Sequence, residues 1–261
     1  MKNSLLAFLQ AALLASVASV ASAAVAQEKI VFGIALEPYP PFSFKSGKGE
    51  WSGFEPELIR AVCERLQAQC PLNEMAWDGL IPALKAQQVD VVLNSLSITP
   101  ERRQVVDFSE PYFFTPALWV ADSSLDVQPT PEGLKGLIIG VQGSTTHSAY
   151  AKQYFGKDST VRYYNDQDDI LADLRSGRID IMLADQLAVE PLLDLPDNSM
   201  LASKGVAPHD PLFGEGVGAA VRKGNDALRE RLNQALQALR DDGTYDAIRG
   251  RYFKADISAR Q

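Results

Sequence analysis

The sequence predicts an α/β fold made of two lobes, and three of its features support this prediction. Short apolar runs, of the kind that form strands buried on both faces, alternate with stretches of helical periodicity. The alternation occurs twice, in residues 30–93 and in residues 137–183, which favours two separate α/β units. The C-terminal region carries helical patterns alone and is expected to return to the first lobe. A single continuous sheet is the alternative that these patterns leave open.

The first unit is expected to contain two strands and two helices. Residues 30–34 form the first strand, and a helix follows from Pro56, with apolar residues at spacings of three and four up to Leu66. Residues 81–86 continue as a second helix, and residues 89–93 form the next strand.

The second unit repeats this pattern. Its strands are expected at residues 137–141, 161–164 and 179–183, and its helices at residues 144–154 and 170–174. Alternation of this kind makes a unit with a parallel sheet at its centre.

The remaining segments connect or follow these units. The polar, proline-containing residues 123–132 are expected to form a surface loop. Asn225 can cap a C-terminal helix that Gly243 ends, and a short last helix starts at Thr244. These helices are expected to serve packing rather than chemistry.

The first 26 residues have the layout of a secretory signal peptide. Lys2 precedes an apolar run at residues 5–14, and small residues offer cleavage after Ala23 or after Ala26. We predict residues 1–23 as the signal peptide and a soluble mature chain outside the cytoplasm. No Cys stands directly after either candidate cleavage site, where it could carry a lipid. A membrane anchor is the alternative, but polar residues dilute the stretch below the roughly 20 apolar residues that a span needs.

Cys63 and Cys70 are predicted to form a disulfide in that oxidising compartment. Seven residues of continuous helix rise about 10.5 Å, which exceeds the roughly 7 Å that separates the Cα atoms of a bridged pair. The helix therefore has to end between the two cysteines, and Pro71 disfavours helical geometry at Cys70. Two separate buried thiols are the alternative.

Composition and motifs exclude several classes of function. The chain has 25 Lys and Arg against 33 Asp and Glu, and its net charge of −8 argues against nucleic acid as a partner. It lacks the G-x-S-x-G, H-E-x-x-H and phosphate-loop motifs of common enzymes. His147 and His209 have no Cys or His at metal-ligand spacing, so we expect no metal, no cofactor and a surface or helix-start position for both. Gly214, Gly216 and Gly218 favour chain reversal or hinge freedom over a dinucleotide site.

Polar residues follow the predicted strands where α/β sheets bind ligands, beyond the carboxyl ends of the strands. Residues 94–102 follow one strand and end in Arg102, residues 142–146 open a helix, and Asp185 follows a third strand. An arginine and a helix N-terminus favour a carboxylate, whereas an aspartate favours an ammonium group. A molecule with both charges is an α-amino acid. An ordinary surface position is the alternative for Arg102.

Four motifs carry a resemblance to a known family. They are GFEPEL at residues 53–58, SLSITPER at 95–102, DFSEPY at 107–112 and DGTY at 242–245. With them the chain resembles the polar amino acid branch of the bacterial periplasmic solute-binding proteins, over nearly the whole mature chain. Within that branch it is most similar to lysine/arginine/ornithine- and histidine-binding proteins, which share the Cys63–Cys70 spacing and its disulfide.

The resemblance implies the type II periplasmic binding protein fold, in which two α/β lobes enclose a ligand cleft. Lobe 1 would comprise residues 27–113 and 217–261, and lobe 2 residues 117–212. Two crossover strands would form a hinge near residues 114–116 and 213–216. The resemblance also implies a periplasmic, non-enzymatic protein that binds an amino acid and delivers it to the membrane permease of an ABC importer. We expect a monomer.

The resemblance assigns the two charged anchors. Arg102 would bind the ligand carboxylate, helped by the backbone at Ser97 and Thr145. Asp185 would bind the α-ammonium group, with Ser95 and Ser97 beside it.

Further pocket residues follow from the same resemblance. Tyr39 and Trp77 would sandwich the ligand side chain, although a place in the core is the alternative for each. Ser144 and Thr146 would belong to the same loop of the second lobe.

Two positions depart from relatives that bind basic ligands. The stretch before Tyr39 is one residue longer, and Glu37 is the candidate for the carboxylate that meets the distal cation of the ligand. Asn94 replaces a serine that is common in these relatives. Arginine, lysine, ornithine and histidine are therefore the expected ligands, with glutamine or an opine-like derivative as alternatives. A sensory partner of a membrane receptor and a cyclohexadienyl dehydratase-like enzyme are the other functions left open.

Overall fold

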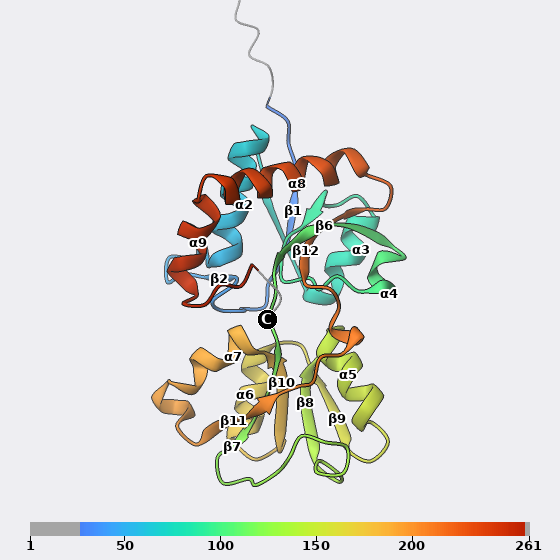
Figure 1. The fold of residues 1–261 in the computed structure, drawn as a ribbon, viewed down its shortest axis with the longest axis vertical. Coiled ribbons are helices and arrows are strands. Elements are labelled where there is room, and N and C mark those ends of the chain that lie inside the picture. The colour runs from blue at the N-terminus through green and yellow to red at the C-terminus, as the bar shows by residue number, and fades with distance from the viewer. Residues whose placement is uncertain (1–26, 259–261) are drawn as a thin grey trace, which may run out of the picture.

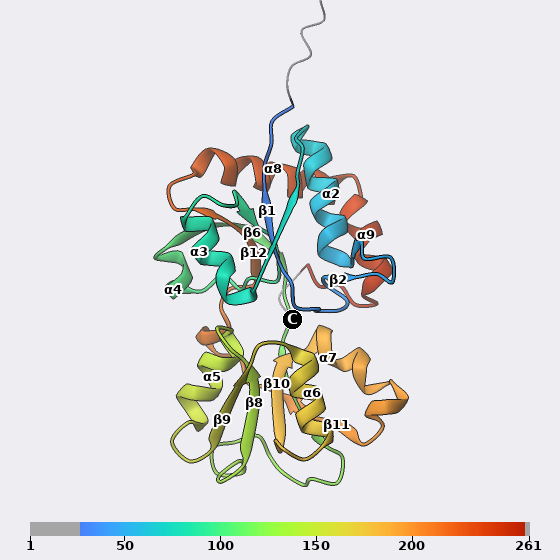
Figure 2. The same ribbon diagram turned by 180° about the vertical axis from the view of Figure 1, so that it is seen from behind.

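The protein folds into two α/β lobes, each built around its own five-stranded sheet (Figure 1, Figure 2). The structure is a computed structural model that describes residues 27–258. The predicted signal peptide and both candidate cleavage sites lie outside these residues. Two separate sheets confirm the two-lobe prediction and exclude a single continuous sheet. Within the described range, no helix combines the length and apolar character that crossing a membrane requires.

Lobe 1 combines the N-terminal part of the chain with its C-terminal helices. Its elements are β1 (Phe32–Ala35), β2 (Phe44–Lys45), β3 (Trp51–Ser52), α2 (Phe54–Leu66), β4 (Leu72–Met75), η1 (Trp77–Gly79), α3 (Leu80–Lys85), β5 (Val91–Val92), α4 (Pro100–Arg103), β6 (Val106–Phe113), β12 (Val217–Arg222), α8 (Asp226–Asp241) and α9 (Thr244–Tyr252). The sheet has the order β4-β1-β5-β12-β6, and β2 pairs with β3 in a small hairpin. β1 runs parallel to β4 and β5, whereas β12 is antiparallel to β5 and β6.

Lobe 2 is formed by the middle of the chain. Its elements are β7 (Ala117–Asp122), β8 (Ile138–Gln142), α5 (Thr146–Phe155), β9 (Thr160–Tyr164), α6 (Gln167–Arg175), β10 (Ile181–Asp185), α7 (Gln186–Leu193), η2 (Pro196–Asn198), β11 (Leu201–Val206) and η3 (Pro211–Phe213). The sheet has the order β11-β7-β10-β8-β9. β8 is parallel to β9 and β10, while β7 is antiparallel to β10 and β11.

Backbone geometry moves the start of two predicted helices. The helix expected from Pro56 begins two residues earlier, after Gly53, whose φ of 111° suits only glycine. The helix expected over residues 144–154 begins two residues later, because Ser144 is left-handed with a φ of 57° and Thr145 is the N-cap. The boundaries of the other predicted strands and helices lie within three residues of those observed.

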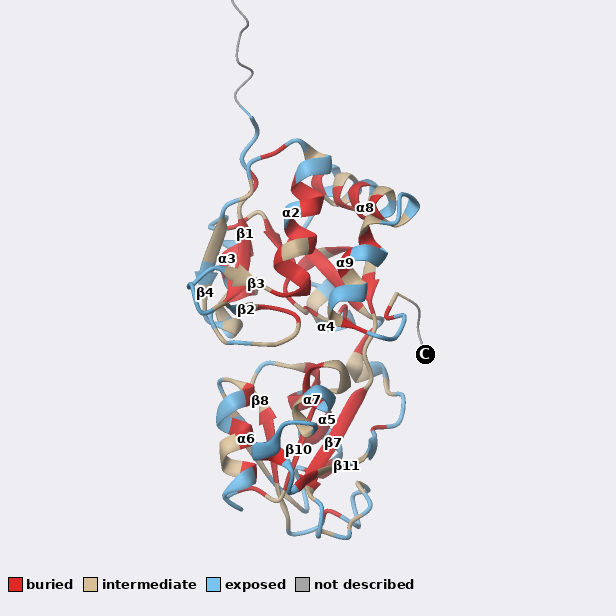
Figure 3. Ribbon diagram, turned by 90° about the vertical axis from the view of Figure 1, so that its left-hand side faces the viewer, coloured by how far each residue is buried: buried red, intermediate tan, exposed pale blue. Residues whose placement is uncertain are grey.

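The core of lobe 1 packs α2, α8 and α9 on one face of the sheet, and aromatic rings fill it. Phe42, Phe54 and Phe113 are fully buried, and the ring of Phe54 lies 5.4 Å from that of Phe253 near the C-terminus. Figure 3 shows the buried residues gathered inside each lobe, with exposed residues on the outer turns of the helices. The C-terminal helices thus return to lobe 1, as predicted.

The chain passes between the lobes twice, after β6 and before β12. In the second passage Gly214 and Gly216 have φ values of 85° and 103°. A Cβ on Gly214 would lie 2.3 Å from the carbonyl oxygen of Ile98, so this close approach requires glycine. The conformations of these two glycines agree with the expected chain reversal, whereas Gly218 lies within β12 and takes no part in it. The lobe boundaries and the hinge motion at these passages stay predictions.

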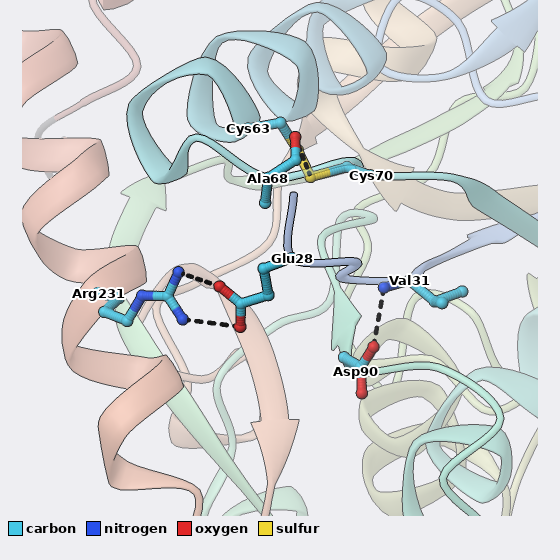
Figure 4. The surroundings of a disulfide bond; sticks show 7 residues. All are labelled: Glu28, Val31, Cys63, Ala68, Cys70, Asp90 and Arg231. Carbon is cyan, nitrogen blue, oxygen red and sulfur yellow. Dashed lines mark hydrogen bonds and ion pairs between the residues drawn. A yellow bond between two sulfur atoms is a disulfide. The ribbon is translucent and has the colours of Figure 1, made fainter. Parts of the chain in front are cut away.

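A disulfide ties the end of α2 to the strand that follows, which confirms the predicted bridge (Figure 4). The Cα atoms of Cys63 and Cys70 are 6.1 Å apart. Between them α2 ends and the chain turns at Gln67, whose φ is 52°. Nearby, Glu28 pairs with Arg231 of α8, so the start of the described chain and the bridge are fastened to the same end of lobe 1.

We predict that the double variant Cys63→Ser/Cys70→Ser loses about 2–3 kcal/mol of unfolding free energy, because the bridge restricts a short loop in the unfolded chain. The two cysteines are separated by 7 positions, so the constraint is smaller than that of a long loop. Urea unfolding of the variant and the wild type, followed by circular dichroism, measures the difference. An unchanged unfolding free energy would contradict the prediction.

Candidate ligand-binding site

A pocket lies between the two lobes, where strands of both sheets end. Lobe 1 contributes the segments after β1, β4 and β5, and lobe 2 contributes those after β8, β9 and β10. The carboxyl ends of parallel strands meet at one edge of a sheet, which is why side chains far apart in the sequence converge here.

The predicted site residues gather in this one pocket. Ten of the eleven line it, namely Glu37, Tyr39, Trp77, Asn94, Ser95, Ser97, Arg102, Thr145, Thr146 and Asp185. The eleventh, Ser144, reaches the site through its carbonyl oxygen, which accepts hydrogen bonds from Trp77 and Arg102. The roles of these residues toward a ligand stay predictions.

Arg102 is held at the rim of lobe 1 by a short capped helix. Thr99 is the N-cap of α4, and its Oγ1 accepts a hydrogen bond from the backbone N–H of Arg102 at 3.2 Å. The guanidinium donates to the carbonyl oxygens of Ser97 at 2.9 Å and Ser144 at 3.1 Å. Burial lowers the pKa of Arg102 to about 10, so the side chain remains a cation at neutral pH.

Asp185 is the last residue of β10 and faces the same pocket from lobe 2. Its Oδ2 accepts a hydrogen bond from the hydroxyl of Tyr39 at 2.5 Å, and its Oδ1 lies 3.5 Å from Nε2 of His147. Burial, and then the charge of Asp185, raise the pKa of Tyr39, which therefore stays a neutral donor.

Three hydrogen bonds join the lobes across the pocket. Tyr39 donates to Asp185, while Trp77 Nε1, at 3.3 Å, and Arg102, at 3.1 Å, both donate to the carbonyl oxygen of Ser144. The guanidinium also lies 5.8 Å from the centre of the Trp77 ring. Tyr39 and Trp77 thus contact the two charged anchors. The sandwich of the ligand side chain that was expected of them stays a prediction.

Asn94 turns its amide into lobe 1. It is 2% exposed, its Oδ1 accepts from the backbone N–H of Ala35 at 2.5 Å, and its Nδ2 donates to Ser43 and to Glu55. The amide of Asn94 therefore connects the end of β1 to the end of β5 below the pocket.

Glu55 is a fully buried carboxyl group beneath the same segment. It accepts hydrogen bonds from the backbone and hydroxyl of Ser95 and, at 2.5 Å, from the hydroxyl of Tyr112. Burial raises the pKa of Glu55 above its ordinary value, although the hydrogen bonds from Tyr112, Ser95 and Asn94 oppose this effect. Glu55 thereby holds Ser95 in its left-handed conformation, with a φ of 49°.

Glu37 adds a second carboxylate to the pocket lining. Its two oxygens accept from the backbone N–H of Trp77 at 3.3 and 3.1 Å. The formally charged residues of the lining are therefore Glu37, Asp185 and Arg102. Two anions against one cation make the pocket more attractive to cations than to anions.

Two polar pocket residues, His147 and Gln167, were not predicted. A third, Gln142, belongs to the predicted strand-end segment 142–146 but was not assigned to the site. His147 is a helix-start residue, as expected, but it is 7% exposed and lies against Asp185. His209 is exposed, in agreement with the expectation. Among residues 27–258, no three His, Cys, Asp or Glu side chains are grouped so as to hold a metal ion.

Comparison with known proteins identifies the family. The chain matches the model of the bacterial extracellular solute-binding proteins, family 3, over residues 30–255. It belongs to this family. The predicted resemblance is therefore confirmed.

Relatives of this family 3 protein bear names that specify amino acids. It is 40% identical over 244 residues to ABC transporter arginine-binding protein 1 of Escherichia coli K12, covering 93% of this chain and 97% of the relative. It is 37% identical over 222 residues to the histidine-binding periplasmic protein of the same strain, covering 84% and 85%. The structure of an ancestral arginine-binding protein bound to arginine aligns with a TM-score of 0.80 and 33% identity, covering 87% of this chain and 99% of that one.

We predict that His147 makes this family 3 protein less stable in mild acid. Burial lowers its pKa below the ordinary 6.5, an effect that Asp185 opposes and Arg102 reinforces. Because the folded pKa is the lower one, the unfolded chain takes up the proton first, and stability that is present above about pH 6.5 is lost as the pH falls. The melting temperature of His147→Gln should therefore fall less steeply than that of the wild type between about pH 7 and about pH 5.

His209→Gln is the matched control, since that side chain is exposed. It should follow the wild-type profile. Identical slopes for the wild type and His147→Gln would contradict the prediction.

Proposed function

We propose that the protein captures a basic L-α-amino acid between its lobes in the periplasm and delivers it to the permease of an ABC importer. The observation that carries the proposal is that Arg102 and Asp185 line one pocket from different lobes. A guanidinium binds a carboxylate in charge-assisted hydrogen bonds, and a carboxylate binds an ammonium group in the same way. The two anchors together therefore select a zwitterion.

The pocket favours a ligand with a basic side chain, because a zwitterion alone leaves one negative charge of the lining without a partner. Once the ligand carboxylate meets Arg102 and its ammonium group meets Asp185, Glu37 remains as an anion in the lining. A distal cation on the ligand compensates this charge. Arginine and histidine, which the names of the relatives specify, both have basic side chains.

Because Arg102 and Asp185 belong to different lobes, a ligand that binds both of them favours the state in which the lobes are closed. A ligand shifts an open–closed equilibrium only by its differential affinity for the two states, and a ligand held from both lobes provides that difference. In the structure Arg102 donates to the neutral carbonyl of Ser144 on lobe 2. The carboxylate of a ligand would replace this acceptor with a charged one, which makes a stronger hydrogen bond.

The location and the partner rest on other observations. The predicted signal peptide directs the chain out of the cytoplasm. The histidine-binding relative is named a periplasmic protein, and the arginine-binding relative is named for an ABC transporter. A monomer that hands its ligand to a membrane permease is the form that we expect.

A thermal-shift screen of the mature protein identifies the ligand. The panel comprises the twenty standard amino acids, ornithine, citrulline and opines, because a ligand that binds only the folded state raises the melting temperature. We expect the largest shifts from basic amino acids, and we expect chromatography to recover them unchanged after incubation. No shift across the panel would remove the amino acid assignment, and conversion of the ligand would favour an enzyme.

We predict that Arg102→Ala and Asp185→Ala each weaken binding of the best ligand by on the order of 30- to several-thousand-fold, since removing one buried charged partner costs about 2–5 kcal/mol. Isothermal titration calorimetry measures the loss. Arg103→Ala and Asp194→Ala are the matched controls, because both side chains are exposed and neither lines the pocket. Wild-type affinity in either anchor variant would refute the site.

Glu37→Gln tests the preference for a basic side chain. The substitution keeps the shape of the side chain and removes its charge, so we predict that arginine binds at least about tenfold more weakly. Binding of L-citrulline, which is neutral at the corresponding end, should change by less than about threefold. An equal loss of affinity for arginine and citrulline would show that Glu37 does not distinguish a charged from a neutral ligand side chain.

A further inference from the structure

A buried amide oxygen in the pocket has no hydrogen-bond partner. Gln167, the first residue of α6, is 6% exposed and lines the pocket. In the described part of the chain, its Oε1 is one of three buried side-chain polar atoms without a partner, and the other two belong to Trp119 and Arg240, outside the pocket lining. A buried acceptor without a donor is costly, so its position beside a ligand pocket points to a donor on the ligand.

The neighbouring hydrogen bonds determine the orientation of the Gln167 side-chain amide, and so which of its two polar atoms lacks a partner. Nε2 of Gln142 donates to the carbonyl oxygen of Asn165 at 2.8 Å, which leaves Oε1 of Gln142 as an acceptor. That oxygen accepts from Nε2 of Gln167 at 3.1 Å. Rotating the Gln167 amide would set two oxygens against each other. This series of hydrogen bonds runs from Asn165 through Gln142 to Gln167. It therefore ends at Oε1 of Gln167, an acceptor that only a hydrogen-bond donor can satisfy.

The place of Gln167 along the sheet edge suits the far end of a long ligand side chain. Asp185 ends β10, Gln142 ends β8, and Gln167 follows β9, in a sheet with the order β10-β8-β9. Two strand spacings, or about 10 Å, therefore separate the position of Asp185 on this edge from that of Gln167. An amino acid with its ammonium group at Asp185 reaches Gln167 only with an extended side chain.

We propose that Gln167 is a specificity-determining residue whose Oε1 accepts a hydrogen bond from an N–H group at the distal end of the ligand side chain. This inference rests on the proposed capture of an amino acid by Arg102 and Asp185. The neutral amide oxygen of Gln167 accepts a hydrogen bond from an N–H group whether or not that group is charged. The carboxylate of Glu37, by contrast, favours a positive charge. Together the two residues select a long side chain that ends in a donor, and they favour a guanidinium group. A side chain that ends in a carboxylate would meet only acceptors.

Three ligands separate these contributions. L-arginine offers a charged distal donor, L-citrulline offers a neutral one of nearly the same shape, and L-norleucine offers none. Their affinities are measured by displacement titration on the wild type and on Gln167→Met, which keeps the length of the side chain and removes the acceptor. For arginine and citrulline we expect losses between about 5- and 150-fold, and for norleucine a change below about twofold.

Gln153→Met is the matched control, because Gln153 lies exposed on α5 in the same lobe. It should leave all three affinities unchanged. If Gln167→Met fails to fold, Gln167→Asn takes its place, since it keeps an amide but withdraws the oxygen by one methylene group. The expected order of losses is the same for that variant.

Two results would overturn the assignment of Gln167. Equal losses for all three ligands would reveal a structural role, and unchanged binding of arginine and citrulline would mean that no ligand donor reaches the oxygen. A different result marks failure of the proposed function itself. In that case the wild type binds none of the three ligands, and the inference about Gln167 falls with it.

Discussion

Two opposite charges, Arg102 and Asp185, reach one pocket from separate lobes, and the other contacts of the pocket serve to hold them there. Arg102 and Asp185 are each partly withdrawn from water, and the pKa of Arg102 falls to about 10 for that reason. Their present partners are two carbonyl oxygens for the arginine, and the hydroxyl of Tyr39 and the imidazole of His147 for the aspartate. All of these groups are neutral at pH 7. Half-buried charges gain most from partners that are themselves charged. A zwitterion supplies both at once.

The scaffold below the pocket keeps these anchors in register. Glu55, at the N-terminal end of α2, holds the backbone of Ser95, and Asn94 links the same segment to the end of β1. One buried carboxyl group thereby ties together the loops that carry Tyr39 and Arg102. Its burial is tolerable because its oxygens accept four hydrogen bonds, from Asn94, from the backbone and hydroxyl of Ser95, and from Tyr112. The pocket of lobe 1 is in this sense preorganised, which reduces the cost of ordering it on binding.

The parts of this architecture that depend on local patterns were predictable from the sequence. Apart from β4, the parallel strands and their helices follow from apolar periodicity, and the pocket residues follow from the strand ends and from the family motifs. The strands that were not predicted are β2, β3, β4, β6, β7, β11 and β12. β6 contains Glu110 and Pro111, and β11 alternates little between buried and exposed positions. Their places depend on long-range pairing rather than on local periodicity.

The missed pocket residues follow the same distinction. His147 gains its role from Asp185, and Gln167 from Gln142, in each case a residue that is distant in sequence. A signal for both did exist. His147 and Gln167 lie in the first turns of the helices that follow β8 and β9, close to the strand ends that identified the other pocket residues. The partner of each residue, however, depends on which strands are neighbours in the folded sheet, where β10 lies beside β8 and β8 beside β9.

A crystal structure of the mature protein with L-arginine would show whether one ligand meets both anchors. We expect the ligand carboxylate within hydrogen-bonding distance of the Arg102 guanidinium and its α-ammonium group within that distance of Asp185. Both lobes would then contact the same molecule. Electron density for arginine outside this pocket, or a ligand that touches only one of the two anchors, would refute capture by Arg102 and Asp185.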